Sequence, residues 1–238
     1  IDKSGKDVTR LCFYSWDENL YLNDNSKTFV TLSAVEMPLI ETKLEPKTEN
    51  PIPETNYEAI YNHCIKFTEK KVQYIQALLR VGFDTIDFGS FVSPKAIPQM
   101  VDTAEVLAQL DLSQTQSKLL AIIANTRGAE MASEHKEIQY LGFPFSISEN
   151  FQMRNTHKTI AESIVTLSEI LEIADKSNKE VVAYLSMGFG NPYGDPWNVE
   201  IVGDWTEKMD KMGVKILSLS DTVGTSNPEV IDYLFSNL

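Results

Sequence analysis

The most informative segment of this chain is residues 86–100, Ile-Asp-Phe-Gly-Ser-Phe-Val-Ser-Pro-Lys-Ala-Ile-Pro-Gln-Met. The apolar run at 85–88 predicts a strand, the small residues and prolines after it predict a loop, and a helix is expected to begin near Pro98. Asp87 lies inside the apolar run, where a carboxylate is costly to bury unless it is paired or used. The segment therefore predicts a buried strand that leads into a functional loop.

Outward from this segment, strands and helices alternate from residue 67 to the end of the sequence. The predicted strands are 85–88, 119–124, 138–143, 181–187 and 214–219, and the predicted helices are 68–81, 98–110, 127–134, 156–176, 196–212 and 228–238. Such alternation implies parallel strands with helices packed outside. It fits an open doubly wound sheet or part of an eight-fold barrel. No Gly-x-Gly-x-x-Gly turn or Walker lysine follows a strand, which disfavours nucleotide binding.

The helical periodicity also predicts which side chains face the core. The helix at 68–81 is expected to be capped by Thr68 and to bury Val72, Ile75 and Leu79. The helix at 98–110 is expected to turn three residues inward: Val101, Ala104 and Leu107. The single long helix expected at 156–176 has an apolar stripe whose members step by four and three residues: Ile160, Ile164, Leu167, Leu171 and Ala174.

The chain before residue 67 has a different character. Short strands are predicted at 11–16 and 28–37, and residues 41–56 read as a linker because Pro46, Pro51 and Pro53 lie among polar residues. We therefore expect two parts, an irregular leader at 1–66 and an α/β domain at 67–238.

Composition limits the classes of partner. A net charge of −13 over 238 residues argues against nucleic acid or an anionic membrane surface as the main partner. No stretch approaches a membrane span in length and apolarity, and no secretory signal is visible. Cys12 and Cys64 have no metal-ligand spacing, which is typical of free thiols in a reducing cytoplasm. The sequence therefore predicts a cytoplasmic protein that does not bind nucleic acid or membranes.

Polar side chains follow the carboxyl ends of the predicted strands, where parallel α/β folds place their sites. The candidates are Asp87 and Ser90 on the first strand, Asn125 after the second, Tyr184 and Ser186 on the fourth, and Asp221 and Thr222 after the fifth. A rim of hydrogen-bonding groups on adjacent strands indicates a pocket. Asp87 and Asp221 are the strongest candidates because lone carboxylates beside apolar strands are rare.

The same rim carries a resemblance to a known family. The blocks are 90–100, Ala-Asn-Thr-Arg-Gly at 124–128, Ser-Glu-Asn-Phe at 148–151, Tyr-Leu-Ser-Met-Gly-Phe-Gly-Asn-Pro-Tyr at 184–193 and Ser-Leu-Ser-Asp-Thr-Val-Gly at 218–224. In this order, residues 68–238 resemble the hydroxymethylglutaryl-CoA lyases, which are metal-dependent aldolase and acyltransferase barrels. The resemblance implies a partial (β/α)8 TIM barrel of about five to six βα units.

The resemblance also implies a reaction. Family members cleave 3-hydroxy-3-methylglutaryl-CoA into acetyl-CoA and acetoacetate by a retro-aldol step. Asp87 matches an acidic residue, usually Glu, close to the reacting centre, and Asp221 matches an active-site position; both are implied to be catalytic. The positions implied to contact an acyl-CoA substrate are Ser90, Asn125, Tyr184, Ser186 and Thr222. The cofactor implied is a divalent cation, Mg or Mn.

Two family motifs are missing from the sequence. No Arg-Asp pair occurs, and His63, His135 and His157 form no His-x-His pair, so we assign no metal ligand. Asn191 stands where many relatives have a cysteine. We expect that the chain is a piece of a lyase gene and is inactive alone. The alternative is a genuine short protein that binds an acyl-CoA or a partner subunit without catalysis. Exposed strand edges would favour association into a homo-oligomer.

Overall fold

The computed structural model of the protein describes residues 67–237. The strands expected at 11–16 and 28–37, the linker at 41–56, Cys12 and Cys64 all lie outside the described residues. The expected division of the chain at residue 67 therefore stays a prediction.

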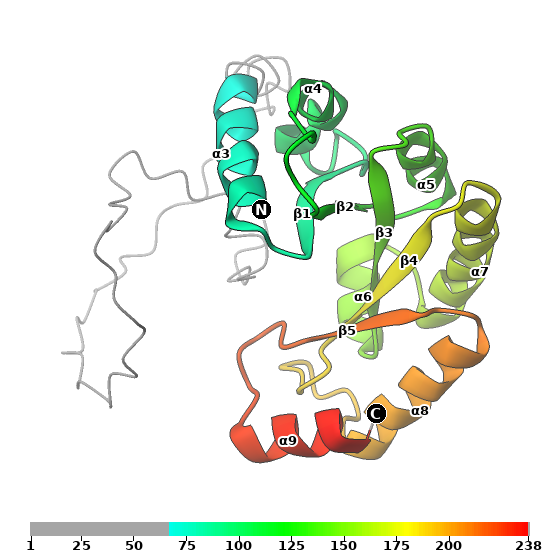
Figure 1. Ribbon diagram of the computed structural model, residues 1–238. Coiled ribbons are helices and arrows are strands. Elements are labelled where there is room, and N and C mark those ends of the chain that lie inside the picture. Colours follow the sequence, from blue (N-terminus) through cyan, green and yellow to red (C-terminus); the bar gives the residue numbers. More distant parts are fainter. Residues whose placement is uncertain (1–66, 238) are drawn as a thin grey trace, which may run out of the picture. The chain divides into compact units, whose positions relative to one another are not determined.

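Five parallel strands form one sheet in the described chain. They are β1 (Thr85–Ser90), β2 (Lys118–Ile122), β3 (Ile138–Ser146), β4 (Glu180–Ser186) and β5 (Ile216–Ser220). Their order in space is the order in the sequence, and every neighbouring pair is parallel (Figure 1). A doubly wound sheet reverses its strand order at a switch point, whereas a barrel does not. The continuous order confirms an α/β fold of partial-barrel type.

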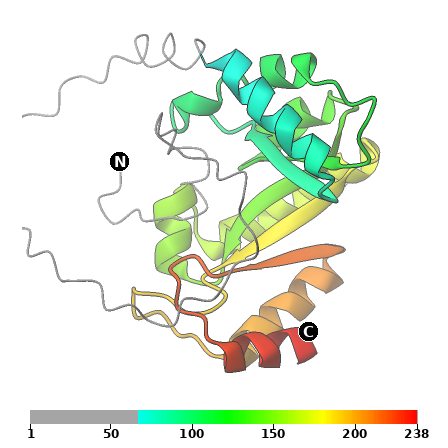
Figure 2. The same ribbon diagram turned by 60° about the vertical axis from the view of Figure 1, so that its left-hand side comes forward.

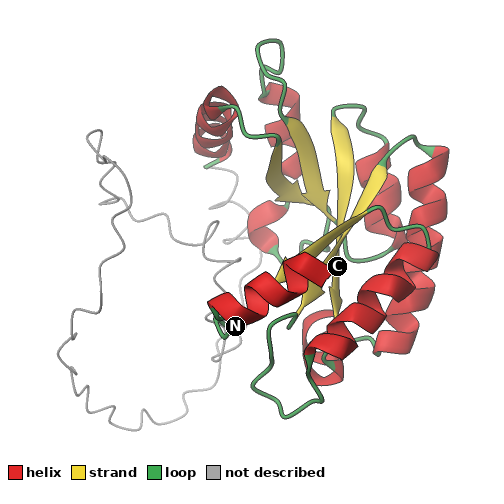
Figure 3. Ribbon diagram, turned by 60° about the horizontal axis from the view of Figure 1, so that its bottom comes forward, coloured by secondary structure: helices red, strands yellow, loops and turns green. Residues whose placement is uncertain are grey.

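Helices connect the strands and cover one face of the sheet (Figures 2 and 3). They are α3 (Thr68–Val81), the 3-10 turn η1 (Pro98–Met100), α4 (Thr103–Gln109), α5 (Thr126–Ser133), α6 (Glu149–Thr156), α7 (Ile160–Lys176), α8 (Val199–Lys211) and α9 (Pro228–Asn237). Several begin at capping side chains that the sequence supplies: Asn125 for α5, Ser148 for α6 and Asn198 for α8. Each cap accepts a bond from a first-turn amide that has no partner inside the helix.

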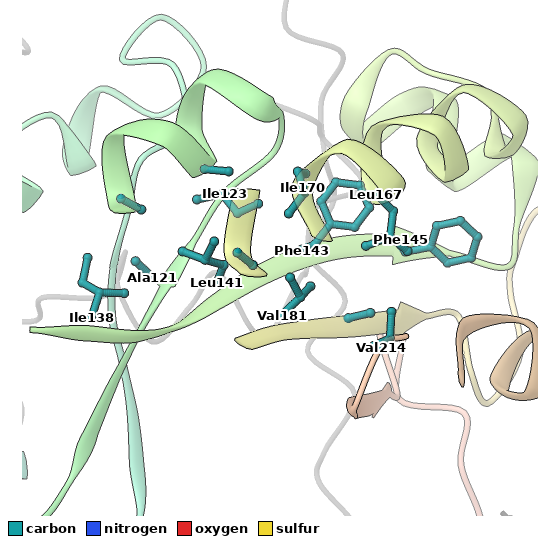
Figure 4. Packing of buried hydrophobic residues seen from close by; sticks show 14 of the residues in the cluster. Ala121, Ile123, Ile138, Leu141, Phe143, Phe145, Leu167, Ile170, Val181 and Val214 are labelled. Carbon is teal, nitrogen blue, oxygen red and sulfur yellow. The ribbon is translucent and has the colours of Figure 1, made fainter. Parts of the chain in front are cut away.

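The core lies between the sheet and the helices. Ala121, Leu141, Ala183 and Leu185 alternate with inner-face residues along their strands and are fully buried. Figure 4 shows Leu141 and Phe143 of β3 beside Leu167 and Ile170 of α7. Each such side chain contributes about 1.5–3 kcal/mol by leaving water. Because these apolar residues face the helices, the residues that alternate with them along each strand face the other side of the sheet.

The first two helices differ in part from the sequence prediction. Thr68 does not cap α3: Phe67 occupies that position, and the Thr68 hydroxyl instead donates to Asp102 at 2.7 Å. Asp102 is almost fully buried and also accepts from Lys71 at 2.5 Å, which ties α3 to the segment before α4. The helix expected at 98–110 is a 3-10 turn followed by α4 from Thr103. Ala104 is exposed, because the later start turns Val106 inward together with the expected Leu107.

The long helix expected at 156–176 is two helices. His157 ends α6 in the left-handed region with a φ of 56°, which a continuous helix cannot contain. Thr159 then starts α7 through a capping box with Glu162. Leu167 and Ala174 of the predicted stripe are buried, while Ile160, Ile164 and Leu171 pack against the edge of the core.

Candidate active site

The second face of the sheet carries the candidate site. Strand register places Pro144, Tyr184 and Ser218 in one row, and Ser146, Ser186 and Ser220 in the next row toward the carboxyl ends. Register partners on parallel strands point to the same face. Because Leu141, Ala183 and Leu185 face the helices, these rows face away from them, toward the side that becomes the interior of a closed barrel. The predicted residues Tyr184 and Ser186 therefore share one wall.

Gly142 makes room on this wall for the ring of Tyr184. A Cβ atom at Gly142 would lie 2.8 Å from the side chains of Leu120 and Ile122 and 3.0 Å from Cε2 of Tyr184. The absence of a side chain lets the tyrosine ring lie close to the backbone of β3. A lone glycine within an apolar strand is the sequence signal for such a close approach.

Asp87 faces the same side as Tyr184. It lies between Ile86 and Phe88, both buried in the core, and the register of β1 shifts between Asp87 and Gly89. The expectation that Asp87 is buried was wrong: the residue is exposed, because alternation turns it away from the helices. Protein atoms nevertheless crowd the carboxyl group enough to desolvate it, which raises the pKa of Asp87 to about 7.

Tyr184 responds to the same surroundings. Burial raises the pKa of its phenol above the usual value, and the nearby charge of Asp87 raises it further. This electrostatic interaction joins β1 to β4 across the wall. At neutral pH the arrangement pairs a carboxyl group that can gain or lose a proton with a phenol that keeps its proton.

Hydrogen bonds position the end of β3. Gln152 of α6 is buried, accepts from the Ser146 amide at 2.7 Å and donates to the Ser163 hydroxyl of α7 at 2.8 Å. The Ser146 hydroxyl accepts from the Ser148 amide at 3.0 Å. The strand end and two helices are thereby linked through polar groups that are all satisfied, so the wall has a defined edge.

The residues after β5 connect that strand to β4. Thr222 accepts from the Met187 amide at 2.8 Å through its hydroxyl oxygen. Asp221 accepts from the amides of Thr225 at 2.8 Å and Ser226 at 3.0 Å. Although partial burial works against it, bonds from the Ser226 hydroxyl and from these amides hold the pKa of Asp221 below its ordinary value. Both predicted residues therefore shape the turn at the rim.

Two other predicted residues also serve the local backbone. The side-chain oxygen of Asn125 accepts from the Gly128 amide at 2.9 Å and caps α5. Ser90 is buried at the end of β1, where its hydroxyl oxygen accepts from the Val92 amide at 3.1 Å. Asp87 lies on β1 and Asp221 directly follows β5, so the two carboxylates lie on and after the two outer strands of the sheet. Contact of these residues with a substrate stays a prediction.

Asp195, in the loop between β4 and α8, is a functional candidate that the sequence did not predict. Its carboxylate accepts from the Ser148 hydroxyl at 2.5 Å and from the Asn150 amide at 3.0 Å, both at the start of α6. Bonds from Ser148 and Asn150 hold the pKa of Asp195 below its ordinary value, against a small opposing effect of burial. An acid between Gly194 and Pro196 resembles an ordinary turn residue, so the sequence gives no sign of this long-range contact.

A hollow of about 350 Å³ lies away from the strand ends. It is bounded by residues of α4, the loop after it and the segment before β3: Ala104, Leu107, Ala108, Leu110, Leu112, His135 and Glu137. It contains none of the predicted site residues and does not belong to the wall described above.

The described residues do not fit a divalent cation. Among residues 67–237, no group of three or more His, Cys, Asp or Glu side chains is placed to hold a metal ion. His135 packs its ring 5.4 Å from that of Phe91, and His157 ends α6.

The sheet and its inner wall define a segment of a parallel α/β barrel with polar groups at the carboxyl ends of its strands. The chain belongs to the HMGL-like family, whose model matches residues 62–238. This assignment agrees with the resemblance carried by the five sequence blocks.

The relatives and solved structures that match this chain include several hydroxymethylglutaryl-CoA lyases. The hydroxymethylglutaryl-CoA lyase YngG of Bacillus subtilis is 34% identical over 171 residues, which cover 72% of this chain and 56% of the relative. The human mitochondrial hydroxymethylglutaryl-CoA lyase is 32% identical, with 71% and 51% covered. The chain spans about half the length of these curated relatives.

The structural comparison gives the same result. The crystal structure of the Bacillus subtilis HMG-CoA lyase matches with a TM-score of 0.66 and 34% identity, over 72% of this chain and 58% of that one. An HMG-CoA lyase from Acinetobacter baumannii, solved in complex with coenzyme A and 3-methylmalate, has a TM-score of 0.66 and 30% identity, over 71% and 54% of the two chains. In residues 67–237 of the present protein, no helix is both long and apolar enough to cross a membrane.

Proposed function

We propose that the inner wall formed by β1 to β5 binds a 3-hydroxy-3-methylglutaryl thioester of coenzyme A and is one side of a carbon–carbon lyase site. The observation that carries the proposal is the placement of Asp87 and Tyr184 on one face of the sheet, near enough for the charge of Asp87 to raise the pKa of Tyr184, in a chain of the HMGL-like family. The named activity of the relatives and the coenzyme A bound to one solved relative support it.

The chemistry assigns a role to each of these two residues. In a retro-aldol cleavage the tertiary hydroxyl loses its proton, the carbon–carbon bond breaks to give acetoacetate, and the enolate of acetyl-CoA gains a proton at carbon. Asp87, with a pKa of about 7, can accept or return a proton at neutral pH. Tyr184 keeps its proton and can donate a hydrogen bond to an oxygen that becomes negative.

The divalent cation of the family, Mg or Mn, would polarise the hydroxyl and carboxylate oxygens of the substrate. The described residues do not fit such an ion, and the sequence has neither Arg-Asp nor His-x-His. The alternative function, acyl-CoA binding without catalysis by this chain alone, therefore stays beside the first. Every role assigned here therefore belongs to the chain's own side chains.

A binding experiment with a matched assay tests the proposal. Calorimetry with 3-hydroxy-3-methylglutaryl-CoA should show binding to the full chain, and Tyr184→Phe should weaken it about tenfold by removing one hydrogen bond to the bound thioester. Tyr233→Phe, on the exposed side of α9, is the control and should bind as the parent does.

An acetoacetate assay with added Mg²⁺ or Mn²⁺ separates the two functions. We expect no release above background from the chain alone, because the Arg-Asp and His-x-His motifs are missing. Release that is abolished by Asp87→Asn would contradict the non-catalytic alternative. Failure of the thioester to bind at all would refute both functions.

We further propose a cytoplasmic location and association of copies into a homo-oligomer. The spacing of the two cysteines supports the location. Within the described sheet, β1 and β5 each pair with a strand on one side only, which favours association. Analytical ultracentrifugation of the full chain would test the second point, and a monomer at all concentrations would contradict it.

A further inference from the structure

The loop between β4 and α8, residues 187–198, is bonded on both of its sides. Toward β5, the Met187 amide donates to the Thr222 hydroxyl at 2.8 Å, and the Thr225 hydroxyl donates to the Phe189 carbonyl at 3.0 Å. The Gly188 amide also donates to the Ser220 carbonyl at 3.2 Å. The first half of the loop is thereby attached to the end of β5 and the turn that follows it.

Its second half is attached to α6 through Asp195. Besides the bonds from Ser148 and from the Asn150 amide, the Asp195 carboxylate accepts from the Asn150 side chain at 2.5 Å. The amides of a helix's first turn have no acceptor within the helix, and the helix dipole favours a negative charge there. Asp195 thus caps α6 from a loop 45 residues further along the chain.

An aromatic contact reinforces the same junction. The Tyr193 ring stacks on Phe151 with centroids 6.5 Å apart, and the Arg154 guanidinium lies 4.9 Å from the Tyr193 ring centroid. Phe151 and Arg154 both belong to α6. Asn191 shapes the loop between these contacts, since its side-chain oxygen accepts from the Tyr193 and Asp195 amides at 3.0 and 3.1 Å.

We infer that Asp195 is a positioning residue that couples the loop 187–198 to α6, so that the rims after β3, β4 and β5 form one rigid unit. The inference deepens the proposed function and rests on it in one respect: the proposed function is what makes this rim a wall of the substrate site. The coupling itself is a property of the free protein and needs no ligand.

Hydrogen exchange of the full chain, measured by mass spectrometry without ligand, tests this inference. Asp195→Ala should raise the exchange rates of amides in 149–151 and in 188–198 about tenfold, because the start of α6 loses its acceptor and the loop loses its attachment to α6. Asp195→Asn keeps an acceptor oxygen and should restore part of the protection. Asp210→Asn, on an exposed position of α8, should change neither segment.

The reciprocal variant separates coupling from a local effect. Asn150→Ala changes an exposed residue of α6, yet it should raise exchange in 188–198. Combined with Asp195→Ala, it should add nothing to the effect of Asp195→Ala alone in that segment. Unchanged exchange in 188–198 for Asn150→Ala, or additive effects in the double variant, would overturn the inference. Because no ligand is present, either result is independent of whether the thioester binds.

Discussion

The two faces of the sheet are built from alternate residues of the same strands but follow different rules. On the helix side, Leu141 and Leu185 are completely buried among aliphatic and aromatic neighbours. On the inner side, Tyr184, Ser186 and Ser218 present polar groups near the strand ends. The helix side therefore stabilises the fold through its buried apolar area, whereas the inner side can carry polar side chains at little cost in stability. Substitutions of adjacent residues on one strand can test this division.

The largest effect is expected on the helix side. Leu141→Ala removes a fully buried side chain and leaves a void that close-packed neighbours cannot fill, so it should destabilise the protein by about 3 kcal/mol. Ser186→Ala on the inner side should cost less than about 0.5 kcal/mol, as is usual for substitutions away from packed or bonded side chains. Urea unfolding followed by circular dichroism measures both, and equal effects would break the comparison.

The next largest loss of stability is expected at Gly142, the residue after Leu141, where a substitution adds volume instead of removing it. Gly142→Ala adds a methyl group within 3.0 Å of Leu120, Ile122 and Tyr184 on the inner side. Overpacking of this kind should cost about 2 kcal/mol, and it should displace the Tyr184 ring. Urea unfolding gives the cost in free energy, and the Tyr184→Ala background, which removes the ring, provides the control. If Gly142→Ala costs as much in that background as in the parent, the ring is not the neighbour that matters.

Sequence reasoning succeeded where local rules decide the outcome. The alternation of strands and helices predicted the parallel sheet, and the five blocks predicted the family. It failed where a distant contact overrides a local signal. Thr68 looks like a helix cap until Asp102, which follows it by 34 residues, takes its hydroxyl. Asp195 has no local signal at all, because its partners lie on α6.

For a similar reason, the sequence placed some of the predicted site residues better than others. Strand alternation places Asp87, Tyr184 and Ser186 on one face, since period two is a local property. The polar residues that follow strands have two competing uses, a ligand or the backbone. Asn125 and Asp221 bond to amides that the next helix or turn leaves unpaired, and this competition cannot be read from residue type alone.

A smaller loss of stability is expected from changing Asn125, the side chain that caps α5. Asn125→Ala removes the acceptor of the Gly128 amide and should cost about 1 kcal/mol. Asn125→Asp keeps an acceptor and should recover most of the stability. If Asn125 also contacts a substrate, Asn125→Asp should still weaken thioester binding in calorimetry, since it replaces a donor with a negative charge. Full recovery of both stability and binding would assign Asn125 to the backbone alone.

The last prediction concerns the pH dependence of stability and distinguishes the inner face from the core most directly. The pKa of Asp87 is raised from 3.8 to about 7 by desolvation. Between these values the unfolded chain has released the proton that the folded protein still binds, so this residue lowers stability as the pH rises from about 4 to 7. Asp87→Asn should remove that slope, so that the difference in Tm between variant and parent grows across this range and then levels off. Asp210→Asn, at an exposed position, is the control. A parallel pair of Tm curves for parent and Asp87→Asn would mean that solvent screens the carboxyl fully. The proton transfer proposed for Asp87 at neutral pH would then lose its physical basis, because an ordinary carboxylate is too weak a base for it.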